Sequence, residues 1–356
     1  MTLAGAVARR VRPNLTWLVC LALGGCGGSE PGLTSEAPLT PGDPVTAPND
    51  SLPPSPGGPQ DSVVPPPDSQ PPSDSTVPPP DSSGTGGPVV PPTHVGIPLG
   101  PYHLPPESYG AGFTGALLAA RPDSLLIDLQ AARKASARIL ISLVGSESRL
   151  LGSDGHFSLA VWKRRVDRFR GVDISSYIED GTIIGHYIMD EPHDPTNWGG
   201  QVVSHSDIDE MARYSKELWP AMATIIRGKP DYLKGYQYKY LDAAWMQYTV
   251  RFGSIENFIS SNVQDAKASG LALVAGLNVI NGGSSSSGIP GTSTGKYGMS
   301  ASELKTWGGA LLAEPYTCAF IVWEYDEKYF SRPAIKAAFD DLGQKARSYP
   351  KKACRP

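Results

Sequence analysis

The sequence lacks several motifs that would assign an activity directly. No His-Glu-x-x-His zinc helix occurs, and no Gly-x-Ser-x-Gly elbow joins an expected strand to an expected helix. No glycine-rich phosphate fingerprint follows the first expected strand. Zinc proteases, serine hydrolases with a nucleophile elbow and dinucleotide-binding sheets are therefore disfavoured, and we expect neither a metal nor another cofactor.

Basic residues are missing from residues 31–93. This stretch is rich in Pro, Ser and Gly, and it repeats the hexapeptide Val-Pro-Pro-Pro-Asp-Ser at residues 64–69 and 77–82. Such a composition cannot bury an apolar core, and consecutive prolines favour an extended spacer. Residues 26–93 are therefore predicted to be a disordered tether.

The rest of the chain carries little net charge. The sequence has 31 Lys and Arg against 35 Asp and Glu, but eight of the acidic and three of the basic residues precede His94. The nearly neutral remainder has no basic stripe, which argues against nucleic acid as a partner. No apolar run reaches the roughly 20 residues of a membrane-spanning helix. Residues 94–356 have the length of one large domain, which we expect to be monomeric.

The N-terminus has the features of an export signal. Three arginines between residues 9 and 12 precede an apolar run at 15–23. The sequence Leu-Gly-Gly-Cys26 ends this segment and resembles the bacterial lipobox, in which small residues precede a lipidated cysteine. The resemblance implies that residues 1–25 are removed and that Cys26 anchors the protein in a membrane, with the outer membrane or cell surface favoured. An ordinary signal peptide, giving a periplasmic or secreted protein, is the alternative.

Two cysteines, Cys318 and Cys354, lie beyond the tether. An oxidising compartment favours a disulfide between them, with two unpaired thiols as the alternative. The bridge would join the C-terminal tail to the start of the last expected strand, and closing this loop would stabilise the fold by roughly 3–4 kcal/mol.

After His94, short apolar runs alternate with amphipathic segments of helical period, a pattern typical of parallel strands joined by helices. Several runs are apolar on both faces, as in buried parallel strands. The expected strands are 112–118, 138–144, 182–189, 223–227, 242–248, 271–277 and 319–323, with a less regular eighth element at 96–103.

The segments between the strands carry helix start and stop signals. The expected helices are 124–136, 159–169, 207–218, 254–268, 300–312 and 332–347. Ser206 with Asp209 is expected to form a capping box at the start of the third helix. The alternation and the domain length predict a (β/α)8 TIM-type barrel, which would be distorted or incomplete if the element at 96–103 does not pair.

One strand end concentrates ionisable residues. The strand at 182–189 leads into Asp190, Glu191, Pro192 and His193, and the active sites of barrels lie at the carboxyl ends of the strands. A strand that ends in Asp-Glu-Pro resembles the acid-bearing strand of glycoside hydrolase barrels. The resemblance implies that Glu191 is the general acid/base and that Asp190 tunes it. The family usually places this strand fourth, so an additional strand is needed before the seven regular ones.

The last expected strand ends in Trp323 and Glu324. This end resembles the opposite side of such sites, where a second carboxylate and a sugar-stacking Trp lie. The resemblance implies that Glu324 is the partner carboxylate, acting as nucleophile or base, with Asp326 and Glu327 as alternatives. Glycoside cleavage needs one carboxyl group that delivers a proton and another that acts from the opposite face.

Each of these carboxylates also has a structural interpretation. Asp190 and Glu191 could form an ion-paired strand end with Arg227 of the next strand, and Glu324 could be a solvated charge. His186, inside the strand, is expected to be a core histidine. The alternative to a glycosidase is therefore a glycan-binding lipoprotein without a catalytic pair, and a structural surface protein is a third interpretation.

Polar and aromatic residues near the other strand ends are expected to contact the hydroxyls and faces of a sugar, although each aromatic residue could equally be core. They are Tyr187, His193, Trp198, Arg227, Trp245, Gln247, Tyr248, Asn278 and Trp323. The expected substrate or ligand is accordingly a carbohydrate. The Gly- and Ser-rich stretch 282–295 on the same face has a composition that allows no fixed structure of its own. It is expected to be a mobile lid or a tolerated insertion.

Overall fold

The computed structural model describes residues 94–355 of the protein. The signal sequence expected at 1–25, the lipidation expected at Cys26 and the tether expected at 26–93 lie outside the described residues. Within the described part, no helix combines the length and the apolar character needed to cross a membrane.

Eight parallel strands form one sheet in the order β1-β8-β7-β6-β5-β4-β3-β2. They are β1 (Leu99–Pro101), β2 (Gly115–Ala119), β3 (Arg138–Ser142), β4 (Ile183–Asp190), β5 (Thr224–Arg227), β6 (Ala243–Trp245), β7 (Ala272–Ala275) and β8 (Thr317–Val322). A parallel bridge between Tyr102 and Leu117 joins β1 to β2 across the remaining seam. The sheet is therefore a nearly closed barrel, as the sequence predicted.

The irregular element expected at 96–103 contains β1, which pairs with β8. A Cβ atom on Gly100 would lie 1.8 Å from the carbonyl oxygen of Gly115 in β2. Glycine at this position therefore permits the close backbone approach of β1 and β2. With β1 counted, the strand that ends at Asp190 is the fourth, which is the position that the resemblance to glycoside hydrolases required.

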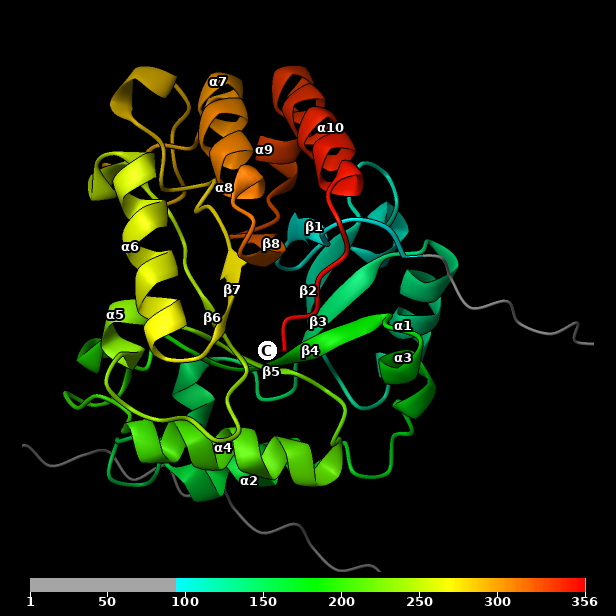
Figure 1. Ribbon diagram of the computed structural model, residues 1–356, viewed down its shortest axis with the longest axis vertical. Coiled ribbons are helices and arrows are strands. Elements are labelled where there is room, and N and C mark those ends of the chain that lie inside the picture. The colour runs from blue at the N-terminus through cyan, green and yellow to red at the C-terminus, as the bar shows by residue number, and fades with distance from the viewer. Residues whose placement is uncertain (1–93, 356) are drawn as a thin grey trace, which may run out of the picture. The chain divides into compact units, whose positions relative to one another are not determined.

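Ten helices of the described residues surround the strands (Figure 1). They are α1 (Leu125–Lys134), α2 (Leu159–Asp167), α3 (Ser175–Glu179), α4 (His205–Leu218), α5 (Pro230–Leu233), α6 (Ile255–Ala268), α7 (Ala301–Glu303), α8 (Gly309–Ala313), α9 (Glu327–Phe330) and α10 (Pro333–Ser348). A π-helical segment at Leu304–Gly308 links α7 to α8, so the helix expected at 300–312 is present but interrupted. The three short helices α3, α5 and α9 were not predicted, because five residues or fewer carry no helical period.

The predicted start of α4 is wrong by two residues. Ser204, not Ser206, caps the helix, and its hydroxyl accepts a hydrogen bond from the N–H of Asp207 (3.1 Å). Asp209 is instead buried, and its carboxylate accepts hydrogen bonds from the backbone N–H groups of Lys239 (3.1 Å) and Tyr240 (2.9 Å). A long-range contact therefore replaces the expected capping box.

Each of the seven strands β2 to β8 contributes at least one side chain to the interior of the barrel. The outer faces of the strands pack against the helices. The inner set includes Leu117, Leu140, Tyr187, Ile225, Trp245, Val274 and Ile321. His186 is buried elsewhere in the core, where it stacks on Trp162 and hydrogen-bonds to Ser215 (2.9 Å). Burial lowers the pKa of His186 to about 3. The prediction of a core histidine is confirmed.

Cys318 and Cys354 form a disulfide, as predicted. Cys318 is the second residue of β8, so the bridge fixes the C-terminal tail to the amino-terminal end of this strand. The carbonyl of Lys352 in this tail also accepts a hydrogen bond from Arg138, the first residue of β3 (3.5 Å). The tail is thus part of the folded domain.

Candidate active site

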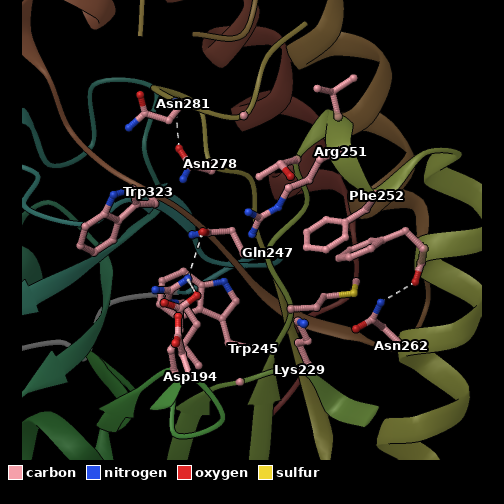
Figure 2. Close-up of a pocket in the computed structure, with 18 of the residues that line it drawn as sticks. Asp194, Lys229, Trp245, Gln247, Arg251, Phe252, Asn262, Asn278, Asn281 and Trp323 are labelled. Carbon is pink, nitrogen blue, oxygen red and sulfur yellow. Dashed lines mark hydrogen bonds and ion pairs between the residues drawn. The ribbon is translucent and has the colours of Figure 1, made fainter. Parts of the chain in front are cut away.

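A cavity of about 1360 Å³ lies at the carboxyl ends of the strands (Figure 2). Most of its wall comes from the segments that follow β4, β5, β6 and β7 and from α6. The segments after β3 and β8 contribute one lining residue each, Glu147 and Trp323. The cavity is therefore displaced from the barrel axis, toward the side of β4 to β7.

Arg227 organises the floor of this cavity. It is the last residue of β5 and lies in register with Asp190, the last residue of β4. Its Nε and Nη2 atoms bind the two carboxylate oxygens of Asp190, the second pair at 2.7 Å. Its Nη1 atom lies 3.3 Å from Oε1 of Glu191 and donates a hydrogen bond to Gln247 (3.1 Å). The ion-paired strand end that the sequence allowed is therefore present, and it lies inside the cavity.

Two indole rings enclose the Arg227 guanidinium. Its central carbon lies 5.8 Å from the ring of Trp245 and 5.7 Å from that of Trp323. Burial opposes the charge of this group, but Asp190, Tyr187 and Glu191 together outweigh the burial and raise the pKa of Arg227. Arg227 is thus a fixed cation whose donors are used by protein acceptors.

The backbone of Glu191 is held in an unusual conformation. Its φ of 34° is uncommon for a residue with a side chain. Three hydrogen bonds maintain it: the Glu191 N–H donates to the Arg227 carbonyl (2.7 Å), and the Glu191 carbonyl accepts from Asp194 N–H (3.0 Å) and from the Trp198 indole (2.9 Å). Such locally strained residues are often found at functional sites. The turn directs the Glu191 side chain to the cavity wall.

Glu147 is a cavity residue that the sequence did not single out. It begins a 3-10 turn, Glu147–Leu150, after β3, and it lines the cavity together with Asp190. Burial, together with the charge of Asp190, raises the pKa of Glu147. The raised pKa favours the protonated form of this carboxyl group, which suits it to carry a proton.

Glu324, the partner carboxylate expected from the sequence, follows β8 but does not line the cavity. Its carboxylate lies 3.3 Å from Nδ1 of His103, and its side chain is 28% exposed. The neighbouring Tyr102 stacks between His103 and Trp323. Burial, followed by the charge of Glu324, raises the pKa of Tyr102 to about 12. Glu324 thus lies beside the site, on the β1 side of Trp323.

Most of the polar residues expected at the rim do line the cavity, whereas several of the aromatic residues do not. The expected residues found in the wall are Asp190, Glu191, His193, Arg227, Trp245, Gln247, Asn278 and Trp323. Trp198 and Tyr248 are buried and are not among the residues that line the cavity. Their polar atoms bind the carbonyls of Glu191 and Gly253, and Tyr187 packs against Trp245 inside the barrel. These three are supporting residues.

The wall also contains residues that no sequence pattern marked. Figure 2 shows Gln247 near the middle of the cavity, with Arg251 and Phe252 on one side and Trp323 on the other. Arg251 and Phe252 belong to a 3-10 turn, Val250–Phe252, after β6. Amide side chains at Asn257, Asn262 and Asn281 add hydrogen-bonding groups. They lie on a loop and a helix that are close only in the folded chain.

The Gly- and Ser-rich stretch 282–295 borders the cavity, as expected, and it has a defined backbone conformation although its composition favours none of its own. Its backbone is tied down by hydrogen bonds such as Gly283 N–H to the Tyr297 carbonyl (2.8 Å) and Gly291 N–H to the Lys296 carbonyl (2.9 Å). The Ser293 N–H donates to Asn281 (3.0 Å). Ser293 has Gly-x-Ser-x-Gly spacing, but it lies in this loop and not at a strand-to-helix turn. Contacts with neighbouring segments therefore supply the order that the composition does not.

Within residues 94–355, no group of three or more His, Cys, Asp or Glu side chains is arranged to hold a metal ion. His193, which lines the cavity, is packed near Tyr232 (5.9 Å between rings). Burial lowers the pKa of His193, although Glu191 partly opposes this effect. At neutral pH its imidazole is uncharged and can hydrogen-bond to a hydroxyl group.

No family model and no curated protein sequence matches this chain. The solved structures that resemble it include a beta-glucuronidase from an uncultured Clostridium species, with 11% identity and a TM-score of 0.47 over 70% of this chain and 50% of that chain. The intracellular xylanase TsXylA from Thermoanaerobacterium saccharolyticum has 12% identity and a TM-score of 0.46 over 68% and 95%. Saccharomyces cerevisiae Gas2p, in complex with laminaritriose and laminaritetraose, has 10% identity and a TM-score of 0.47 over 73% and 66%.

A GH2 beta-galacturonidase from Eisenbergiella tayi also resembles this chain, with 13% identity and a TM-score of 0.44 over 68% of this chain. This chain matches about half the length of that enzyme (46%) and of the Clostridium glucuronidase (50%). At these identities and scores, the likenesses carry no argument about residues or substrate. The barrel is established by its own strand order and register.

Proposed function

We propose that the barrel domain binds a carbohydrate in the 1360 Å³ cavity and cleaves a glycosidic bond there with two carboxyl groups. The observation that carries this proposal is the gathering of Glu147, Asp190 and Glu191 around Arg227 at the cavity floor. The neighbouring Trp323 is half-buried and lines the cavity, where its indole can contact a sugar.

The two carboxyl groups have different surroundings, and this difference assigns their roles. Burial and the charge of Asp190 raise the pKa of Glu147, and on this ground we assign it the delivery of a proton to the leaving oxygen. Glu191 is paired with Arg227 and acts as the carboxylate that attacks the sugar carbon of the scissile bond or activates a water molecule. Asp190 holds Arg227 in place, and Arg227 in turn contacts Glu191. Enzymes that use two carboxyl groups in different roles typically hold them in different environments.

Glu324 remains a rival for the role of partner carboxylate, because it follows Trp323 at the end of β8. Glu147 is favoured over it because Glu147 lines the cavity, whereas Glu324 is bound to His103. The variants Glu147→Gln and Glu324→Gln separate the two assignments. The larger loss of hydrolysis identifies the partner.

The proposal is tested by incubating the full chain with a panel of polysaccharides and aryl glycosides and measuring released reducing ends. Hydrolysis that disappears in Glu191→Gln, with the circular dichroism spectrum unchanged, supports the glycosidase. The rival function is a glycan-binding protein, which the engagement of both strand-end acids with Arg227 favours. Binding on a glycan array without hydrolysis would select that rival.

We also propose that the protein is an exported monomer, anchored in the cell envelope through a lipid on Cys26 and carrying its barrel on the tether 26–93. The motif Leu-Gly-Gly-Cys26 and the proline-rich composition of the tether support this proposal. The test is fractionation of cells that produce the full chain or its Cys26→Ser variant. The full chain should be in the membrane fraction and the variant in the soluble fraction.

A further inference from the structure

The charged side chains that line the cavity are divided between its two sides. The wall that follows β3, β4 and β5 contains five acidic residues, Glu147, Asp190, Glu191, Asp194 and Asp231, with Arg227 and Lys229. The wall formed by α6 and by the segments after β6 and β7 contains Arg251, Lys296 and one acid, Asp265. The carboxylate of Asp265 is already bound by Lys234 (2.9 Å). The cavity therefore has an acidic side, which holds the carboxyl cluster, and a basic side.

The two cations of the basic side have free donors. Within residues 94–355, neither Arg251 nor Lys296 forms a side-chain hydrogen bond or an ion pair, and both are exposed. Arg251 lies 5.0 Å from the ring of Phe252, and Figure 2 shows its guanidinium directed into the cavity toward Gln247. Arg227, in contrast, is used by Asp190, Glu191 and Gln247. Lys229, an exposed cation of the acidic side, likewise has no side-chain partner within residues 94–355, but it lies beside the carboxylates of that side. A negatively charged group that enters the cavity therefore finds two unpaired cations on the basic side and one on the acidic side.

The separation of charge also orients a ligand. A carboxylate on the ligand is repelled by Glu191 and Asp231 on the acidic side and is attracted by Arg251 and Lys296. The planar guanidinium of Arg251 can bind both oxygens of a carboxylate at once. A neutral glycan would leave these two cations without partners.

On the basis of the proposed function, we propose that the substrate is an acidic glycan and that Arg251 and Lys296 bind the carboxylate of a uronic acid unit. This unit lies on the basic side of the cavity while the linkage to be cleaved lies at the carboxyl cluster. Arg251 and Lys296 are thus determinants of specificity, separate from the groups that cleave the bond.

The test measures binding of the full chain carrying Glu191→Gln, so that the ligand is not consumed. The probes are alginate, polygalacturonate and hyaluronan, each compared with the same polymer after reduction of its carboxyl groups to neutral alcohols. At least one acidic polymer should bind roughly tenfold or more tightly than its reduced form. Its binding should weaken as the salt concentration rises. A sulfated neutral polymer shows whether the site selects carboxylate or accepts any anion.

Substitutions test whether Arg251 and Lys296 are the residues that bind the carboxylate. In the Glu191→Gln background, Arg251→Gln or Lys296→Gln should weaken binding of the acidic polymer by about tenfold and weaken binding of its reduced form much less. Lys267→Gln is the matched control, because Lys267 of α6 lies over the ring of Tyr316 and does not line the cavity. Equal binding of acidic and reduced polymers, no binding of any acidic polymer, or wild-type binding by the Arg251 and Lys296 variants would overturn the proposal.

The same experiment separates this proposal from the proposed function. Hydrolysis of neutral glycans by the wild-type chain, without preference for acidic ones, would leave the glycosidase standing and remove the acidic specificity. Binding of an acidic polymer that the wild-type chain does not cleave would leave the acidic specificity standing and remove the glycosidase.

Discussion

The guanidinium of Arg227 and the carboxylate of Asp190, the last residues of neighbouring strands, form a two-point ion pair at the floor of the cavity. The side chains are only 13% and 12% exposed, so neither charge is well solvated. The pair links the fold to the site, because the same guanidinium also contacts Glu191. Loss of one partner should therefore affect stability and activity together.

Arg227→Met should destabilise the full chain by about 3–5 kcal/mol, because it leaves Asp190 as a buried carboxylate without a partner. Denaturant unfolding at neutral pH measures this change. The double variant with Asp190→Asn should be destabilised by less than the sum of the single changes. A loss below about 0.5 kcal/mol in Arg227→Met, the range of ordinary surface substitutions, would contradict the assigned importance of the pair.

Glu147→Gln should change the pH dependence of hydrolysis. Burial and Asp190 raise the pKa of Glu147 above its usual 4.5. A proton donor works only while it is protonated, so wild-type activity should fall as the pH rises through this raised pKa. The variant should lose this decline and be slower by about 100-fold on substrates with poor leaving groups.

Aryl glycosides with acidic leaving groups provide the control for Glu147, because their departure needs little protonation. Glu147→Gln should cleave them at nearly the wild-type rate. An equal loss on both kinds of substrate would show that Glu147 supports the structure and does not deliver a proton.

His186 should make the fold sensitive to acid. Burial lowers its pKa from 6.5 to about 3 in the folded chain, so between these values the unfolded chain binds a proton that the folded chain does not. Stability from this group is present above pH 6.5 and is lost as the pH falls toward 3, by up to about 5 kcal/mol. His186→Gln should shift the midpoint of acid unfolding to lower pH, and an unchanged midpoint would contradict this account.

The disulfide between Cys318 and Cys354 should contribute roughly 3–4 kcal/mol, because it closes a loop of 36 residues. The double variant Cys318→Ala/Cys354→Ala should unfold at correspondingly lower denaturant concentration. Wild-type protein in reducing buffer should approach the variant, while the variant itself should not respond to reductant. Equal stability of the two oxidised proteins would be the contrary result.

The barrel could be predicted from the sequence because its signals are local. Buried parallel strands are apolar on both faces, and segments such as 254–268 have a clear cap and helical period. The strand end at Asp190 and Glu191 was found for the same reason, since carboxylates directly after an apolar run are conspicuous. The predicted capping box of α4 was wrong, because the carboxylate of Asp209 instead accepts a hydrogen bond from the N–H of Lys239, thirty residues away in the sequence.

The rest of the site depends on contacts that leave no local pattern. Glu147 lies in a short turn after β3, and only its place in the cavity wall marks it. In the sequence, Arg251 and Lys296 are charged residues that no pattern distinguishes, and only the folded chain shows that both line the cavity. Trp198 and Tyr248, conversely, looked like rim residues because aromatic residues at strand ends can be either core or ligand contacts. Their burial shows that they belong to the core.

The most direct test of the central claim compares hydrolysis of one cleaved glycan by the full chain, Glu191→Gln and Asp231→Asn. Asp231 lines the same cavity and lies outside the carboxyl cluster, so it controls for a loss of cavity charge. The account predicts at least about a 100-fold loss of rate in Glu191→Gln and a much smaller change in Asp231→Asn, with both variants folded. Wild-type activity in Glu191→Gln would contradict it.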